Sequence, residues 1–378
     1  MRLPPLPLPV NSMLEIILLI STAVLLGITL YNVLLWPKLT TRPMAVQQDV
    51  SVLIPARNEE SNLAACLDAV LQQPAGLLEV LVYDDHSTDV TPEILTEFVG
   101  RDGRVRAVQP KPLPDGWCGK NFACAQLAGA ARGSWLLFLD ADARLTQGAI
   151  ARMVTEAVHR NATFLSCWPR LQMVGFWERV LMPLLNFVVF TIYPAPLSLA
   201  RSDASLGLAH GACLLIERAT YEKLGGHAAV RGEIFEDTRL AKLWRERGER
   251  SLCLDGSGEV SVRMYGSLAE IWLGFQKNFF PAFRRETGFW GFLLLHSVMF
   301  LSPFLLAVWS PNWQTVAAAF CVVLMRASLA LRFRHPLWSV VLHPLAETLL
   351  LLLALSSWWR CKSGRGVVWK ERTYRSTQ

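Results

Sequence analysis

The hydrophobic positions of the chain follow two patterns, with short runs between polar turns in the middle and long runs at both ends. Between Asp49 and Arg263, short apolar runs alternate with blocks of helical period, which is typical of a βαβ arrangement. The predicted strands are Val50–Ile54, Leu78–Tyr83, Trp135–Leu139 and Ala212–Ile216. The predicted helices are Glu59–Gln72, Thr91–Val99, Asn121–Ala131, Gly148–His159, Ala219–Leu224 and Asp237–Arg247. The pattern therefore predicts an α/β domain over residues 48–265, with a mostly parallel sheet flanked by helices.

The long runs predict membrane attachment at both ends. A Pro-rich leader, residues 1–12, precedes an apolar run over 13–36 that is long enough for a transmembrane helix. A cleaved signal peptide is the alternative, but the run is long and lacks a clear small-residue cleavage site. Residues 290–331 predict a transmembrane hairpin with a short turn.

The third apolar run near the C-terminus, residues 337–359, is harder to place. It contains Pro344, and His343 and Glu347 are costly at bilayer depth. If it spanned the bilayer, the basic tail at 360–378 would lie outside, against the charge rule. We therefore expect a re-entrant or interfacial segment with a cytoplasmic tail.

Two further segments predict helices in the membrane interface. Residues 172–199 are strongly apolar but contain Pro183 and Asn186. If this segment crossed the bilayer, Asp140 and the later acidic residues would lie on opposite sides. An interfacial position avoids that problem, and residues 266–286 carry apolar side chains at helical spacing that suit the same position.

Composition supports membrane contact and narrows the class of protein. Of 378 residues, 52% are hydrophobic, and the net charge of +6 gathers near the apolar segments. This distribution suits an anionic bilayer surface, and no nucleic-acid motif is present.

Lys38 and Arg42 follow the first apolar run, whereas only Arg2 precedes it. The positive-inside rule therefore places the α/β domain on the cytoplasmic face of the cell membrane. The eight cysteines form no CxxC pair, which argues against a zinc site or a disulfide framework, and no motif indicates an obligate protein partner.

Candidate chemistry begins just after the most apolar predicted strand, Trp135–Leu139. Asp140 and Asp142 follow it with one residue between them, at the strand end where open α/β sheets bind ligands. Oxygen-only ligation suits a hard cation such as Mg²⁺ or Mn²⁺, which would neutralise a diphosphate. The alternative is a strand-ending turn with two solvated acids.

Two earlier strand ends carry polar turns of the same kind. Pro55-Ala-Arg-Asn-Glu59 follows the first strand, and Asp84-Asp-His-Ser-Thr-Asp89 follows the second. Each can offer backbone donors and carboxylates to a nucleotide base and ribose. Helix capping is the alternative, and for Thr88 and Asp89 it is the first interpretation.

The order of these motifs resembles that of family 2 glycosyltransferases with the GT-A fold, over roughly residues 48–282. The shared motifs are Pro-Ala-Arg-Asn-Glu, Asp-Asp-x-Ser-x-Asp, Asp-Ala-Asp and Glu236-Asp237. Trp117-Cys-Gly-Lys120, Gly225-Gly-His227 and Trp369-Lys-Glu-Arg-Thr-Tyr374 are similar to motifs of membrane enzymes that glycosylate carotenoids and hopanoid-type lipids. Ceramide glucosyltransferases are more distant relatives. The resemblance implies transfer of a hexose, with glucose favoured, from a UDP-sugar to a lipid acceptor.

The resemblance also implies a role for individual residues. Ala56 and Glu59 would border the uridine, and either Asp84 or Asp85 would bond the uracil. Lys120 would face the diphosphate, Asp140 and Asp142 would hold the ribose and the metal, Gly211 and Ala212 would lie beside the donor sugar, and Glu236 belongs to the same donor site. For His210 a structural role is at least as good an interpretation as a sugar contact.

Asp237 is the candidate catalytic base. It opens a predicted helix, where the dipole favours a carboxylate and would keep it ionised. An acceptor hydroxyl needs a positioned base to attack the anomeric carbon, and a single displacement inverts that centre. The alternative is an ordinary helix N-cap with Glu236 as its exposed neighbour.

Two departures limit the resemblance. Processive synthases carry Gln-x-x-Arg-Trp, whereas Gln276-Lys-Asn-Phe-Phe280 keeps only the Gln. Lys277 or the pair Arg284-Arg285 could close the diphosphate site, but an interfacial basic patch is the first interpretation for them. Glu371 stands where the family pattern expects Gly, which weakens a loop role for Lys370 and Arg372. The remaining alternatives are a polyprenyl-phosphate sugar transferase, a processive polysaccharide synthase and a non-enzymatic membrane scaffold.

Overall fold

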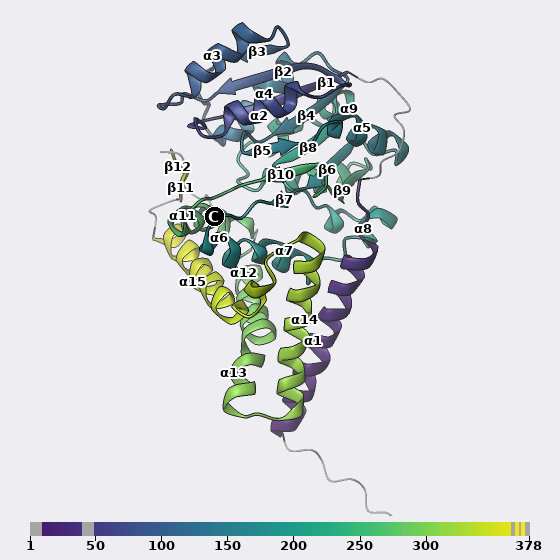
Figure 1. The fold of residues 1–378 in the computed structure, drawn as a ribbon, viewed down its shortest axis with the longest axis vertical. Helices are drawn as coiled ribbons and strands as arrows, with labels where there is room; N and C mark the ends of the chain where they lie inside the picture. The colour runs from purple at the N-terminus through teal and green to yellow at the C-terminus, as the bar shows by residue number, and fades with distance from the viewer. Residues whose placement is uncertain (1–9, 40–48, 284, 364–366, 370–371, 375–378) are drawn as a thin grey trace, which may run out of the picture.

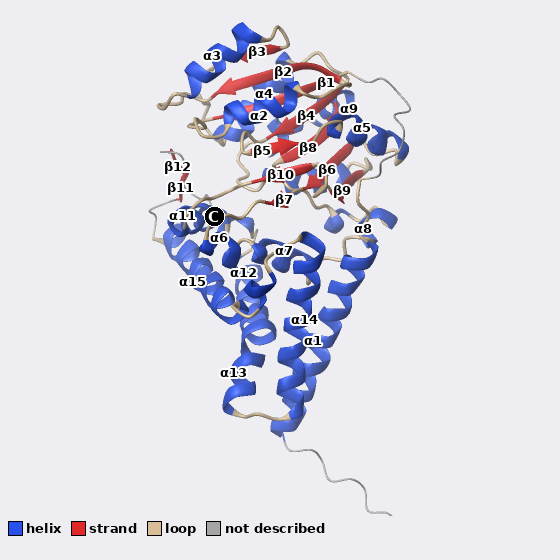
Figure 2. Ribbon diagram, in the orientation of Figure 1, coloured by secondary structure: helices blue, strands red, loops and turns tan. Residues whose placement is uncertain are grey.

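The computed structural model describes residues 10–39, 49–283, 285–363, 367–369 and 372–374. An α/β domain stands on a tapering bundle of helices (Figures 1 and 2). The strands of its main sheet are β1 (Val50–Ala56), β2 (Leu77–Asp84), β3 (Val105–Val108), β4 (Trp135–Leu139), β6 (Phe164–Trp168), β8 (Cys213–Glu217) and β9 (Ser251–Asp255). Their order is β3-β2-β1-β4-β8-β6-β9, and only β8 runs antiparallel to its neighbours β4 and β6. The prediction of a mostly parallel α/β sheet is confirmed.

Alternate residues of the central strands belong to two separate hydrophobic cores. Val52 and Ile54 of β1 belong to the core that contains α2 (Leu63–Leu71) and α5 (Ala149–His159). Leu53, between them, faces the core that contains α4 (Gly119–Ala130), α9 (Arg218–Leu224) and α10 (Glu236–Glu246). Helices therefore cover both faces of the sheet, and each fully buried side chain of this kind contributes about 1.5–3 kcal/mol.

Several elements were absent from the predicted pattern. Strands β3, β6 and β9 were missed, as was a small second sheet of β5 (Ala143–Leu145), β10 (Val260–Val262) and β7 (Arg170–Leu171). The helix predicted from Glu59 begins only at Leu63, because the amides of Asn62 and Leu63 both bond the Glu59 carbonyl in a turn. The other predicted helices, α3 (Thr91–Arg101) among them, agree to within about two residues.

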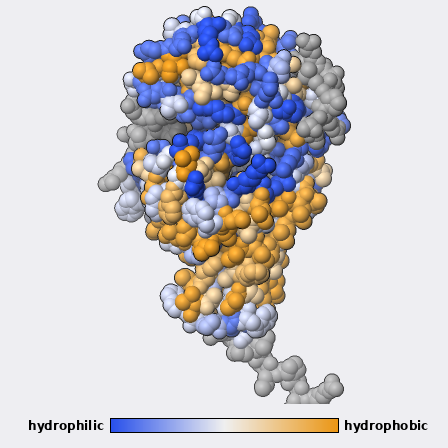
Figure 3. Space-filling view, viewed as in Figure 1, coloured by the Kyte–Doolittle hydropathy of each residue, from blue (hydrophilic) through white to orange (hydrophobic). Residues whose placement is uncertain are grey.

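Among the described residues, three helices are long and apolar enough to cross a membrane: Ser12–Leu35 of α1 (Val10–Leu35), Glu286–Trp309, and α14 (Trp313–Phe333). The second combines α12 (Glu286–Leu295), a π-helical turn η4 (His296–Leu301) and α13 (Ser302–Trp309). Their surface forms the apolar band below the polar domain in Figure 3. These helices support membrane association.

The last apolar run does not lie parallel to these three helices (Figure 1). After η5 (Leu337–Val340), α15 (His343–Lys362) lies obliquely beside α11 (Leu268–Asn278) rather than along α1 and α14 (Figure 1). Within the described chain α15 is not among the helices that meet the criteria for a span. A short hairpin, β11 (Val367–Trp369) and β12 (Arg372–Tyr374), follows next to α11.

Short helices separate the α/β domain from the bundle. They are α6 (Phe176–Leu181), α7 (Pro183–Phe190) and α8 (Leu197–Ala200). Phe187 and Phe190 of α7 are fully buried, and α7 contacts both α1 and α14. Much of the segment 172–199, which was expected in the membrane interface, is therefore buried within the protein.

Candidate active site

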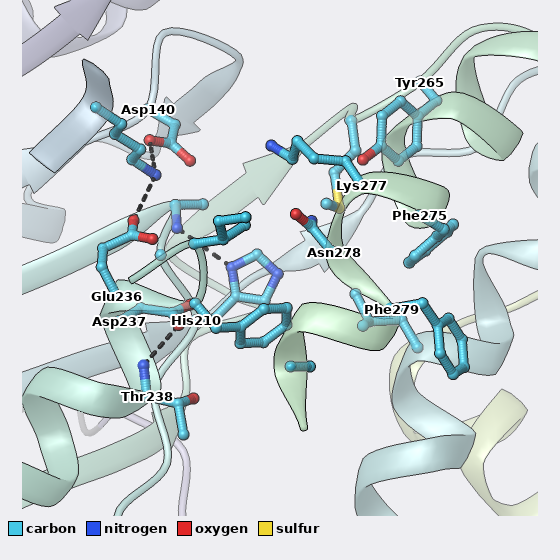
Figure 4. Close-up of a pocket in the computed structure, with 18 of the residues that line it drawn as sticks. Asp140, His210, Glu236, Asp237, Thr238, Tyr265, Phe275, Lys277, Asn278 and Phe279 are labelled. Atoms are coloured by element: carbon cyan, nitrogen blue, oxygen red, sulfur yellow. Dashed lines mark hydrogen bonds and ion pairs between the residues drawn. The ribbon is translucent and has the colours of Figure 1, made fainter. Parts of the chain in front are cut away.

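A cavity of about 500 Å³ lies at the junction of the α/β domain and the bundle. Figure 4 shows its two sides, with Asp140, His210, Glu236 and Asp237 on one and Lys277, Asn278 and Phe275 on the other. Its volume is in the range of small-molecule sites. The polar part of the lining comes from the ends of β1 and β4 and the start of α10.

Lys120 connects two of the predicted acids. It lies in the first turn of α4, and its Nζ is 2.7 Å from Asp140 Oδ1 and 3.2 Å from Glu236 Oε1. Burial alone would lower the pKa of Lys120, but the two carboxylates raise it well above its usual value. Lys120 is therefore a fixed positive charge between the end of β4 and the start of α10.

Asp140 and Asp142 line the same cavity, and they are the candidate metal ligands. The described part of the chain contains no group of three or more His, Cys, Asp or Glu side chains that could hold a metal. The protein would thus supply two carboxylates, and water and diphosphate oxygens would complete the coordination. That donor set suits Mg²⁺ or Mn²⁺, which bind through one or two carboxylates plus substrate phosphates.

Asp84 and Asp85, the two adjacent acids in the turn after β2, make different contacts. Asp84 Oδ1 accepts hydrogen bonds from the backbone amide and hydroxyl of Ser87, so Asp84 holds the turn. Asp85 lines the cavity, and its backbone amide donates to the carbonyl of Ala56 at 2.8 Å. Ala56 and Glu59 line the cavity as well. Asp89 accepts from the amide of Thr91 at 3.0 Å, as a capping residue does.

Asp237 projects into the same cavity from the second residue of α10. Burial, followed by the charge of neighbouring Glu236, raises the pKa of Asp237 to about 7. The expectation that the helix dipole would keep this carboxyl fully ionised is therefore wrong, because desolvation outweighs the dipole. Glu236 is also buried, at 6% exposure, which does not fit the alternative interpretation of a helix N-cap with an exposed Glu236.

Gly211 allows the backbone to pass close to the carboxylate of Asp237. A Cβ added to Gly211 would lie 3.2 Å from Asp237 Oδ2 and 3.4 Å from Lys120 Nζ. The next residue, Ala212, accepts a hydrogen bond from the amide of Asp140 at 3.1 Å. A glycine at 211 thus leaves room beside the candidate base.

His210 lines the cavity with a neutral ring. Its Nδ1 accepts from the amide of Ala212 at 3.3 Å, and its ring packs edge-on against Trp168 at 5.1 Å. Burial lowers the pKa of His210 to about 4. His210 is therefore held by the fold and uncharged near neutral pH.

The opposite wall contains residues that the motif analysis did not assign firmly. Lys277, Asn278 and Tyr265 line the cavity from α11 and the segment before it. Lys277 had been considered for closing the diphosphate site, and its side chain extends into the cavity (Figure 4). Arg284 lies outside the described residues, as do Lys370 and Glu371. Helical spacing on α11 predicted an apolar face, but it did not indicate which polar residues would line the cavity.

The cavity continues from this polar end into an apolar end between helices. The apolar lining comes from α7, α11, α12 and α15, and includes Leu184, Leu185, Val188, Ile271, Trp272, Phe275, Phe279, Phe292, Leu349, Leu350 and Leu353. Four helices thus make a hydrophobic wall that faces the strand-end carboxylates. A molecule in the cavity would meet charged groups at one end and hydrocarbon at the other.

Comparison with solved structures defines the class of fold. A mannosyltransferase from Pyrobaculum calidifontis, PcManGT, solved in complex with GDP-Man and Mn²⁺, superposes with a TM-score of 0.53 at 20% identity. The superposition covers 92% of this chain and 99% of that one. The α/β domain is a GT-A fold.

Sequence comparison finds similarity to a glycosyltransferase family. Residues 51–225 match the family described as Glycosyl transferase family 2. The 4,4'-diaponeurosporenoate glycosyltransferase of Staphylococcus haemolyticus (strain JCSC1435) is 30% identical over 58% of this chain and 57% of its own length. The enzyme of that name from Staphylococcus aureus (strain USA300) is 27% identical over 59% of each chain. The match thus spans less than two thirds of these relatives.

Proposed function

We propose that this protein is an inverting glycosyltransferase that moves a hexose from a UDP-sugar to a lipid acceptor at the cytoplasmic face of a membrane. The observation that carries the proposal is a single cavity with the Lys120, Asp140, Glu236 and Asp237 charges at one end and membrane-bundle side chains at the other. A charged donor and an apolar acceptor would meet in such a cavity. The relatives' names support a lipid-like acceptor, such as a carotenoid or a hopanoid.

In the proposed donor site, the strand-end turns hold the nucleotide. Asp85 is the better of the two adjacent acids for the base, because Asp84 is engaged by Ser87. Ala56 and Glu59 would border the uridine, Asp140 would face the ribose and the metal, and Asp142 would face the metal.

A bound Mg²⁺ or Mn²⁺ would act as a Lewis acid on the leaving diphosphate. Lys120 and Lys277 would place positive charge on the phosphates from opposite walls.

Asp237 is the proposed general base. It would accept the proton of the acceptor hydroxyl as that oxygen attacks the anomeric carbon, and the bond to the diphosphate would break in the same step. A pKa near 7 makes the carboxylate a stronger base than an ordinary Asp while it is still ionised in part at neutral pH. Attack opposite the leaving group inverts the anomeric centre.

The proposal is tested with purified membranes, radiolabelled UDP-glucose, Mn²⁺ and a total lipid extract, with Asp237→Asn as the matched variant. We expect label in one organic-soluble product, absent with the variant. A product ladder would instead indicate a processive synthase, and an Asp237→Asn variant at near-full rate would indicate a polyprenyl-phosphate acceptor, which is already ionised. If the protein bound no UDP in the presence of Mn²⁺, the enzyme assignment would fail in favour of a scaffold.

A further inference from the structure

The membrane bundle contains a cluster of four ionisable side chains that the proposed chemistry does not use. Arg326 of α14, His296 of the π-helical turn η4, and His343 and Glu347 of α15 are each at most 1% exposed. Charged or ionisable groups at such depth are costly and usually functional. We propose that this cluster is a positioning site that fixes the walls of the apolar, acceptor end of the cavity. The inference rests on the proposed function for its assignment of that end to the acceptor.

One half of the cluster joins two cavity walls directly. His296 Nδ1 lies 2.6 Å from Glu347 Oε1, which ties α15 to the π-helical turn. The ring of His296 stacks on Phe292 with centroids 4.0 Å apart, and Phe292 lines the cavity. Leu350, one turn beyond Glu347, lines it as well. The pair therefore sets the spacing between α12 and the cavity face of α15.

The other half supports the third wall, on α7. The guanidinium carbon of Arg326 lies 5.8 Å from the centre of the Phe187 ring. The centre of the His343 ring lies 4.8 Å from the centre of the same Phe187 ring. His343 Nε2 is also 3.3 Å from the carbonyl of Phe300 in the π-helical turn. Phe187 is fully buried, and it lies on the same helix as the cavity-lining residues Leu184 and Val188. Three of the four helices that line the apolar end, α7, α12 and α15, are thus in contact with one polar cluster.

The energetics favour a positioning role over general stabilisation. None of the three guanidinium nitrogens of Arg326 has a hydrogen-bond partner within the described chain. A well-packed apolar cluster would stabilise the bundle as well or better, since buried charges lose hydration that pairing repays only in part. What a polar cluster adds is a unique arrangement of the helices that meet there.

The test measures binding to the two ends of the cavity separately. Purified protein in nanodiscs is titrated with cis-parinaric acid, a fluorescent polyene acid, and in parallel with UDP and Mn²⁺ by calorimetry. His296→Ala and Glu347→Ala are compared with Glu347→Gln, which keeps an oxygen for His296. Thr348→Ala is the control, since Thr348 is exposed on the same helix and bonds only the Pro344 carbonyl of that helix.

We expect both alanine variants to weaken binding of cis-parinaric acid about tenfold, with UDP affinity within about twofold of the wild type. Glu347→Gln and Thr348→Ala should stay near wild-type values for both ligands. Unchanged affinity for cis-parinaric acid in both alanine variants would overturn the proposal. Loss of UDP binding in both would also overturn it, because the cluster would then hold the whole fold. Wild-type protein that binds both ligands but transfers no sugar would reject the proposed function alone.

Discussion

Arg332 Nη2 lies 2.7 Å from Asp255 Oδ2, and this ion pair joins the last turn of α14 to the end of β9. The guanidinium also donates to the carbonyls of Val33 at 3.1 Å and Trp36 at 2.8 Å, at the end of α1. The Trp36 indole in turn donates to the carbonyl of Cys253 at 2.9 Å. One partly buried arginine thus links α1 and α14 to the sheet that carries the candidate active site.

Replacing this arginine should therefore cost much more than replacing a surface one. In Arg332→Ala the Asp255 carboxylate, whose side chain is 0% exposed, would remain buried without its cation. We expect a loss of about 3–5 kcal/mol in the free energy of unfolding, read from thermal unfolding in detergent. The matched control is Arg179→Ala, because Arg179 is exposed in the same layer of helices. Equal effects of the two substitutions would contradict the prediction.

The raised pKa of Asp237 predicts a pH dependence of catalysis. A general base works when deprotonated, so kcat/KM should fall as the pH is lowered through about 7. Asp237→Asn should lower kcat by about 10²–10⁴-fold and leave no acid limb in the residual rate. The check is a pH–rate profile with radiolabelled donor. An acid limb near pH 4 in the wild type would show that the carboxyl behaves as an ordinary Asp.

The same pKa predicts an effect on stability with the opposite sign. A carboxyl whose pKa is raised from 3.8 to about 7 in the folded state binds its proton more tightly folded than unfolded. Its contribution to stability is complete below pH 4 and is lost as the pH rises through about 7. Asp237→Asn cannot ionise, so at pH 8 it should unfold at the same temperature as the wild type or a higher one. A less stable variant at pH 8 would contradict this account.

Metal removal provides a fourth prediction, on Asp140 and Asp142. Chelation with EDTA should abolish transfer, and added Mg²⁺ or Mn²⁺ should restore it. Asp142→Asn should lower the affinity for UDP about tenfold or more in the presence of Mn²⁺ and little in its absence. Asp203→Asn, an exposed acid whose partner is Arg201, is the control. Metal-independent UDP binding in the wild type would rule out this role.

Much of the fold followed from the sequence, because the pattern of the central strands reflects their burial on both faces. Trp135–Leu139 was bounded correctly, since Gly133 and Ser134 precede it and Asp140 ends it. A Cβ at Gly133 would lie 2.6 Å from the amide of Ser51, so the glycine marks where the strand enters the sheet. β9 was missed because Ser251 and Asp255 break its apolar run, although both are buried in the fold.

The site was predictable only in part, for a reason that lies in chain topology. Acids at the carboxyl ends of parallel strands lie along one edge of the sheet, so Asp85 after β2 and Asp140 after β4, on either side of β1, could be assigned to one edge from sequence. Lys277 and Asn278 come from α11, which reaches the cavity only after the chain has passed through β9 and β10. The pKa of Asp237 depends on its burial in the folded chain and on the charge of Glu236, and the local sequence gives no measure of that burial.

The position of Lys277 on α11 predicts how the protein binds the diphosphate of the donor. It lines the cavity opposite Asp140, so a donor diphosphate would lie between Lys277 and Lys120. Lys277→Ala should weaken UDP more than uridine, because the charge acts on the phosphates and not on the base. Binding of both ligands by calorimetry checks this, and Lys223→Ala is the control, since Lys223 is exposed and pairs with Glu249. Equal losses for UDP and uridine would show that Lys277 shapes the cavity and does not bind the diphosphate.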